Sequence, residues 1–276
     1  MGTDRTWALV RDADLEVIPL KTLLDQLPVV PPGSRVAITC SPKFGLERTL
    51  EHTSAAAEAG YRCIPHVAAR QVSGGTELRA VVDRLAALGV ADLYVIGGDV
   101  KEPVGELGCA AELLEALQGI DHGFARVGVA CYPEGHPTIP DAVLWSDLLR
   151  KQPMAQYMVS QVCFDAAAIV SWLHAARDRG VTLPLRISVA GPLKITKLIE
   201  LSVRMGVGPS MSYLRKQHGL VGSVLRGGAY RPEELVASIE QELGGEDLGI
   251  EGLHISTFNQ LDSTVSWQRR VGAPPS

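Results

Sequence analysis

Short apolar runs alternate with longer amphipathic stretches along most of the chain. Apolar runs bounded by polar or turn-forming residues are typical of buried strands, and eight lie at residues 14–20, 35–40, 61–67, 92–97, 126–132, 157–164, 185–190 and 253–258. Between them, stretches with apolar residues at every third or fourth position predict helices, at residues 46–60, 76–89, 165–180, 193–206, 210–219, 231–245 and 260–272. The helix at 165–180 is expected to begin at an N-cap, Asp165.

This order of elements sets the predicted fold class. Eight strands alternating with helices over about 250 residues predict an α/β protein, a single (β/α)8 TIM barrel, with extra helices before the last strand. No linker rich in glycine, serine or proline interrupts the pattern, so residues 1–276 are expected to form one domain. A doubly wound open sheet is the alternative, but the segment after the first strand lacks the glycine fingerprint G-x-G-x-x-G. In a barrel, the active site is expected at the C-terminal ends of the strands.

Composition and charge narrow the function classes. Hydrophobic residues make up 46% of the chain, charged residues 21%, and the formal net charge is -5. This balance argues against a general binder of nucleic acid or of anionic membranes. No apolar run approaches the roughly 20 residues of a membrane span, and the N-terminus lacks a signal-peptide pattern. We therefore expect a cytoplasmic protein with a small-molecule partner; the sequence leaves a homo-oligomer open.

The five cysteines give no sign of a metal site or a disulfide framework. They lie far apart and form no CxxC pair. Four fall within or at the end of predicted strands, where a free cysteine acts as a small core residue. The cysteines are Cys40, Cys63, Cys109, Cys131 and Cys163. No metal site is predicted.

Polar side chains stand in or just after most of the predicted strands. They are Glu16, Thr39, His66, Asp99, Tyr132, His136, Gln161, Asn259 and Gln260. Taken singly, each has a structural explanation: Asp99 as a helix cap, His66 as a satisfied core histidine, Gln161 as a link between strands. Together on one rim, they favour a functional site. Glu16 most needs a functional explanation, because burying a carboxylate inside an apolar strand costs free energy unless the group is paired or protonated.

Five ordered motifs resemble those of the methylenetetrahydrofolate reductase family. They are DLEVIPLK (14–21), GGDV (97–100), CYPEGHP (131–137), SQVCFD (160–165) and STFNQLD (256–262). The resemblance implies a (β/α)8 barrel and an oxidoreductase that reduces 5,10-methylenetetrahydrofolate to 5-methyltetrahydrofolate. In the family, hydride passes from NAD(P)H through bound FAD.

The resemblance also assigns the catalytic residues. Glu16 is implied as the general acid that protonates N10 of the folate and opens the ring to an iminium cation. Its apolar neighbours Leu15, Val17 and Ile18 are expected to raise its pKa. Asp99 is implied to stabilise the cation, and Gln161 to hydrogen-bond the pterin.

The remaining site residues divide between cofactor and substrate. The implied FAD-binding residues are Thr39, His66, Gly97, Gly98, Asp99, Cys109, Tyr132, His136, Arg150 and Lys151. Arg150 and Lys151 are expected to meet the cofactor phosphates. The implied substrate-binding residues are Gln161, Arg215, Asn259 and Gln260. Arg215 belongs either to a solvated basic face or to a lid that meets the glutamate tail of the folate.

Departures from the family pattern leave three functions open. Gly97 and Gln260 stand where the family has arginines, and few basic residues remain for the cofactor phosphates. The first hypothesis is an FAD-dependent reductase. The second is a reductase that takes hydride directly from NADH or NADPH, between which the sequence does not choose. The third is a barrel that binds folate or flavin without turnover.

Overall fold

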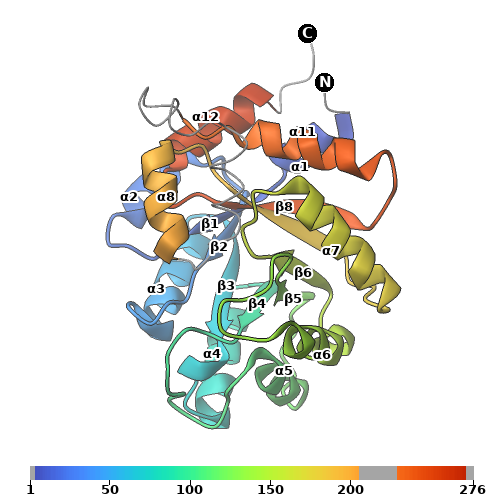
Figure 1. The fold of residues 1–276 in the computed structure, drawn as a ribbon. Coiled ribbons are helices and arrows are strands. Elements are labelled where there is room, and N and C mark those ends of the chain that lie inside the picture. The colour runs from blue at the N-terminus through green and yellow to red at the C-terminus, as the bar shows by residue number, and fades with distance from the viewer. Residues whose placement is uncertain (1–3, 205–228, 272–276) are drawn as a thin grey trace.

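Eight parallel strands follow one another around a closed barrel in the computed structural model, which describes residues 4–204 and 229–271 (Figure 1). Each strand pairs with the next along the chain, and the last pairs with the first. The strands are β1 (Asp14–Val17), β2 (Arg35–Ile38), β3 (Arg62–Ala68), β4 (Asp92–Ile96), β5 (Arg126–Cys131), β6 (Tyr157–Ser160), β7 (Leu185–Ala190) and β8 (Ile250–Ser256). The predicted (β/α)8 barrel is confirmed.

Helices surround the barrel (Figure 1). They are α1 (Asp4–Arg11), α2 (Leu23–Gln26), α3 (Gly45–Glu58), α4 (Gly75–Ala87), α5 (Ala110–Gln118), α6 (Asp141–Lys151), α7 (Ala166–Asp178), α8 (Ile195–Arg204), α11 (Pro232–Leu243) and α12 (Leu261–Val271), with short 3-10 turns at Leu27–Val29, Ala69–Gln71 and Gln152–Met154. Asp165 caps α7 as predicted, because its carboxylate accepts a hydrogen bond from the Ala168 amide at 3.1 Å. Helices α1, α2, α5 and α6 were not predicted, and the predicted helix at 210–219 lies outside the described residues. Within the described ranges, no helix has the length and apolar character needed to cross a bilayer.

Alternate residues of each strand face opposite sides of the barrel wall. Leu15 and Val17 point outward and belong to the core between the strands and the helices. Glu16, between them, points inward. The inner apolar layer consists of Ala37, Ile64, Tyr94, Tyr157 and Val159. This arrangement fills the middle of the barrel and leaves polar side chains above and below it.

Gly128 makes room for one of the two tyrosines of this inner layer. Its partner across the β5–β6 pairing is Tyr157, and a Cβ added at position 128 would lie 2.3 Å from Cζ of that ring. A side chain at 128 would therefore displace the tyrosine from the barrel interior.

A network of charged side chains closes the N-terminal end of the barrel. Asp14 is fully buried and accepts hydrogen bonds from Arg35 and, at 2.6 Å, from Nη1 of Arg186. Nε of Arg186 donates to Glu251 at 2.8 Å, and Arg126 donates to the same carboxylate oxygen at 2.6 Å. We call Asp14, Arg35, Arg126, Arg186 and Glu251 the base network. Every charge in it has an opposite charge within hydrogen-bond distance.

The four cysteines on strands or just after them are buried, as predicted for core residues. Cys40, Cys63, Cys131 and Cys163 are free thiols, and Cys109, at the start of α5, is a half-buried free thiol. Burial raises the pKa of the Cys63 thiol to about 12, so it stays protonated and unreactive at neutral pH.

Candidate active site

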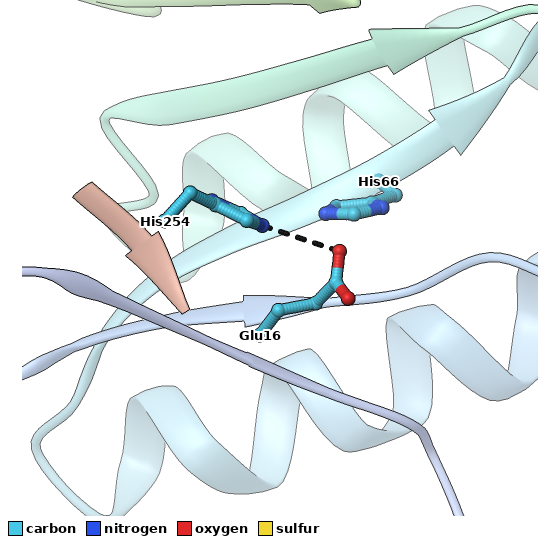
Figure 2. A group of neighbouring side chains, drawn as sticks. All are labelled: Glu16, His66 and His254. Atoms are coloured by element: carbon cyan, nitrogen blue, oxygen red, sulfur yellow. Dashed lines mark hydrogen bonds and ion pairs between the residues drawn. The ribbon is translucent and has the colours of Figure 1, made fainter. Parts of the chain in front are cut away.

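Three polar side chains meet inside the barrel beside Tyr94 of the inner apolar layer. Glu16 comes from β1, His66 from β3 and His254 from β8 (Figure 2). One potential ligand atom from each residue lies within 4.8 Å of the other two. Both histidines are buried, whereas 24% of the Glu16 side chain is exposed. We call these residues the mouth triad.

The register of β1 and β8 brings the triad together. Glu16 pairs with Ser256, and Asp14 with His254, across the strands that close the barrel. His254 Nε2 lies 3.2 Å from Oε2 of Glu16, and the Ser256 hydroxyl donates to Oε1 at 2.9 Å. Both carboxylate oxygens of Glu16 are therefore held by β8.

The Glu16–His254 contact is an ion pair at neutral pH. Burial would raise the pKa of Glu16, but the hydrogen bond and positive charge of His254 lower that pKa to about 2. Burial would lower the pKa of His254, but the carboxylates of Asp14 and Glu16 raise it to about 9. The expected rise in the pKa of Glu16 is wrong. Leu15 points away from the barrel interior, whereas His254 lies inside the barrel and contacts the Glu16 carboxylate.

His66 is not a satisfied core histidine. Burial lowers its pKa to about 4, so the ring is neutral at pH 7. Its Nε2 is buried and has no hydrogen-bond partner among the described residues. The ring packs edge-on against Tyr94 at 4.6 Å between centroids, and one ring nitrogen points into the space between Glu16 and His254 (Figure 2). Such an unpaired nitrogen is unusual inside a protein and calls for an explanation.

Asp99 lies in an exposed bend after β4 and does not cap a helix. Helix α5 begins at Ala110, and Cys109 occupies its N-cap position. Tyr132, half-buried after β5, has a pKa of about 12, raised first by burial and also by the negative charge of Asp99. Asp99 is therefore close to Tyr132 on the C-terminal side of the barrel.

The glycines before Asp99 set the path of this bend. Gly98 has φ of +90°, and a Cβ there would lie 2.9 Å from Cβ of Ala68. Gly97 accepts a hydrogen bond through its carbonyl from the Arg70 amide at 3.0 Å. Both positions fix the loop after β4 against the end of β3.

Thr39 and Gln161 also lie at strand exits. Thr39 follows β2 and is half-buried. Its amide donates a hydrogen bond to the Val17 carbonyl at 3.0 Å. Gln161 follows β6 and is half-buried, and its side-chain oxygen accepts from the Val162 amide at 2.8 Å. The two remain on the rim, as the resemblance requires.

Asn259 joins the exits of β8 and β1. Its side-chain oxygen accepts from the Ile18 amide at 2.7 Å, and its Nδ2 donates to the Ile18 carbonyl at 2.8 Å. Asn259 is buried and has φ of +58°. In the structure Asn259 therefore fixes the backbone beside Glu16. Gln260 is exposed, and Arg215 lies outside the described residues.

The two cations expected at cofactor phosphates are already paired. Arg150 makes two hydrogen bonds to the Glu115 carboxylate, at 2.7 and 2.8 Å. The amino group of Lys151 is buried and lies 2.6 Å from the Asp147 carboxylate and 3.2 Å from the Ala130 carbonyl. These positions do not fit a phosphate site, because each positive charge is neutralised within the chain.

Tyr132 and His136, which are also implied for the cofactor, lie in the loop between β5 and α6, and Cys109 lies at the start of α5. His136 packs edge-on against Tyr132 at 5.3 Å between ring centroids. The ring nitrogen Nδ1 of His136 accepts from the Thr138 amide at 3.3 Å. A cavity beside them is lined by residues of the β5–α6 loop and α6, including Tyr132, Asp147 and Lys151.

Comparison with known proteins supports the family and the fold of the chain. The family model described as methylenetetrahydrofolate reductase matches residues 36–207, which is more than half of the chain. The chain belongs to this family. Among solved structures, an uncharacterized protein from Clostridium thermocellum that binds two copies of 5-methyl-5,6,7,8-tetrahydrofolic acid matches with a TM-score of 0.68 and 12% identity, over 98% of this chain and 99% of that one. A putative lyase/mutase from Burkholderia cenocepacia J2315 matches with a TM-score of 0.48 and 13% identity, over 94% and 83% of the two chains. The TM-score of the first match shows a shared fold.

Sequence reasoning overlooked His254 and Ser256. Both belong to the predicted strand at 253–258, and they alternate with outward-facing Leu253 and Ile255. That alternation, with closure of the barrel between the last and first strands, was the available signal. The prediction of no metal site rested on the cysteines and did not weigh Glu16, His66 and His254 as ligands.

Proposed function

We propose that this member of the family binds a reduced folate at the C-terminal mouth and reduces 5,10-methylenetetrahydrofolate to 5-methyltetrahydrofolate, with NADH or NADPH as the source of hydride. The observation that carries the proposal is the ionised Glu16–His254 pair, because it holds a proton beside a partly exposed carboxylate at the end of the barrel where TIM-barrel enzymes react.

The pair supplies the proton that opens the folate ring. In the resting protein the proton resides on His254 Nε2, 3.2 Å from Oε2 of Glu16. As N10 of the folate approaches Glu16, the carboxylate takes this proton and passes it to N10, and the bond between N10 and the methylene carbon breaks. N5 and the methylene group become an iminium cation. Glu16 thus acts as general acid through a proton that His254 holds.

The surrounding residues hold the acid and stabilise the cation. The Glu16 carbonyl accepts hydrogen bonds from the Thr257 amide at 3.1 Å and its hydroxyl at 2.7 Å, and Asn259 fixes the next residue. These contacts pre-organise the carboxylate. In the proposed complex Asp99 adds a negative charge that favours the iminium cation. Gln161 hydrogen-bonds the pterin. Hydride from C4 of the nicotinamide then adds to the methylene carbon and completes the methyl group.

The paired state of Arg150 and Lys151 favours direct hydride transfer over a route through FAD. Family membership makes FAD a reasonable cofactor, yet FAD carries two phosphates, and both cations expected to bind them are engaged by Glu115 and Asp147. NADH and NADPH carry the same diphosphate, but they bind transiently as substrates, whereas a resident FAD must be held tightly. We therefore propose direct transfer from the nicotinamide to the folate, the second of the two reductase hypotheses, and derive no step from a flavin.

The test is formation of 5-methyltetrahydrofolate by the purified full chain. The protein is incubated with 5,10-methylenetetrahydrofolate and NADH or NADPH, with and without added FAD, and the product is measured by mass spectrometry. We expect product without FAD, no flavin absorption band in the purified protein, and little change when FAD is added. Activity that appears only with FAD would contradict the direct route, and no product under any of these conditions would contradict the reductase.

A further inference from the structure

We infer that the mouth triad is a binding site for one divalent transition metal ion of the Zn²⁺ or Co²⁺ type. Two imidazoles and one carboxylate converge on one point inside the barrel (Figure 2). Nothing in the proposed reduction of folate requires a metal ion, so the site is an additional property of these residues.

The donor set matches the chemistry of such ions. Zn²⁺ binds imidazole nitrogen and carboxylate oxygen, and sites with three protein ligands leave a position open for another molecule. Two histidines and one carboxylate also hold Fe²⁺ in many proteins. The three ligand atoms lie within 4.8 Å of one another, whereas tetrahedral ligands at about 2.1 Å from zinc are about 3.4 Å apart. Modest side-chain rotation would close the site.

His66 provides the second, independent observation. Its Nε2 is buried and lacks a hydrogen-bond partner among the described residues. The whole residue is only 4% exposed. A ring nitrogen of His66 points toward the other two members of the triad (Figure 2). A metal ion would use the lone pair that otherwise stays unsatisfied at a cost in stability.

The contacts around the triad resemble those that orient the ligands in known kinds of metal site. Histidines that bind metals commonly direct the other ring nitrogen toward a carboxylate, which orients the ring. Nδ1 of His254 lies 3.7 Å from Oδ2 of Asp14, which Arg186 holds in place. The Ser256 hydroxyl fixes the second oxygen of Glu16. Glu16 therefore faces the position of the cation directly, and Asp14 supports it from the far side of the His254 ring.

Binding of a metal ion would exclude proton transfer at the same site. The ion would take the place of the proton between Glu16 and His254, on the oxygen that meets N10 in the proposed reduction. This consequence rests on the proposed function, whereas the metal site itself does not. Zn²⁺ is then expected to inhibit the reductase, and more weakly at lower pH, because protons compete with the ion for His254.

The experiment measures metal binding without folate or nicotinamide. The full chain is treated with a chelator, dialysed and titrated with Co²⁺, followed by visible absorption, and with Zn²⁺, followed by calorimetry. We expect one tight site per chain, with the spectrum of nitrogen and oxygen ligands and without the strong charge-transfer band of a cobalt–thiolate bond. His66→Gln and His254→Gln should each weaken this site about 100-fold or more.

Two matched variants separate the triad from other donors. His174→Gln removes a histidine whose side chain is 47% exposed on α7, and Cys109→Ser removes the half-buried thiol; both should bind Co²⁺ and Zn²⁺ as the wild type does. Circular dichroism and thermal unfolding confirm that each variant is folded. The inference is overturned if the wild type has no tight site, or if folded His66→Gln and His254→Gln variants keep wild-type affinity. Because no substrate is present, either result leaves the reductase proposal standing.

Discussion

Asp14 and Glu16 are two residues apart on one strand, point into the same barrel and share the same histidine, yet their surroundings differ. Asp14 is fully buried and is paired with Arg35 and Arg186, which belong to a closed set of opposite charges. Glu16 is partly exposed, and its charged hydrogen-bond partner is His254, a group that can give up a proton. The comparison shows how depth in one barrel separates a structural carboxylate from a reactive one.

The first way to test the comparison is to remove the reactive carboxylate. Glu16→Gln keeps the size and the hydrogen bond from Ser256 but cannot carry a proton to N10. We expect kcat for the formation of 5-methyltetrahydrofolate to fall by about 10²–10⁴-fold, the range of general acid catalysis, with folate affinity nearly unchanged. Steady-state kinetics and calorimetric titration with 5-methyltetrahydrofolate measure the two quantities. Equal losses in kcat and affinity would assign Glu16 to binding instead.

Replacement of Asp14, the structural carboxylate, should instead lower the stability of the protein. Asp14→Asn leaves Arg186 buried beside a neutral amide, and removal of one partner of a buried ion pair lowers the free energy of unfolding by about 3–5 kcal/mol. Urea unfolding followed by circular dichroism checks this value. The matched control is Asp12→Asn, because Asp12 pairs with Arg11 on the surface, where its side chain is 65% exposed; it should change stability by less than about 1 kcal/mol. Similar losses in both variants would remove the distinction between buried and exposed charges.

The pH dependence of stability tests whether His254 carries the proton between the two carboxylates. This residue faces Asp14 and Glu16 of β1, His66 of β3 and Tyr94 of β4. Its pKa is raised from 6.5 to about 9 on folding. Protonated His254 therefore stabilises the folded protein fully below pH 6.5, and this stabilisation is lost as the pH rises through about 9.

We expect the wild type in chelator-containing buffer to lose on the order of 2 kcal/mol more than His254→Gln between pH 6.5 and 9. Glu16 does not contribute in this window, since its folded pKa of about 2 places its effect below pH 4.5. Parallel pH profiles for the two proteins would show that His254 is not the titrating group.

The smallest effect is expected outside the barrel. Arg150 and Glu115 are 47% and 45% exposed at the side chain, and exposed ion pairs contribute about 0–1 kcal/mol. Arg150→Ala should leave KM for NADH or NADPH and the unfolding midpoint nearly unchanged. A large rise in KM would return Arg150 to the cofactor site that the family resemblance implies.

The local pattern of the sequence was enough to predict the barrel and much of its rim. Continuous apolar runs and amphipathic stretches depend on neighbouring residues, so eight strands and the N-cap at Asp165 were within reach. The rim positions of Thr39 and Gln161 followed from the rule that strand exits share one face.

The charge state of the site was out of reach for a physical reason. The pKa of Glu16 depends on His254, which is 238 positions away in the chain and becomes a neighbour only when β8 closes on β1. The pairing of Arg150 depends on the packing of α6 against α5, and α5 and α6 were not predicted. Contacts of this kind are set by the closed barrel and not by sequence spacing.

Glu16 is ionised at neutral pH because His254 carries the proton. The most direct measurement is the nitrogen chemical shift of His254 in ¹⁵N-histidine-labelled, metal-free protein, assigned by loss of its signals in His254→Gln and followed from pH 6 to 10. We expect both ring nitrogens to be protonated at pH 7 and to titrate near the pKa of about 9. A neutral His254 ring at pH 7 would contradict the account.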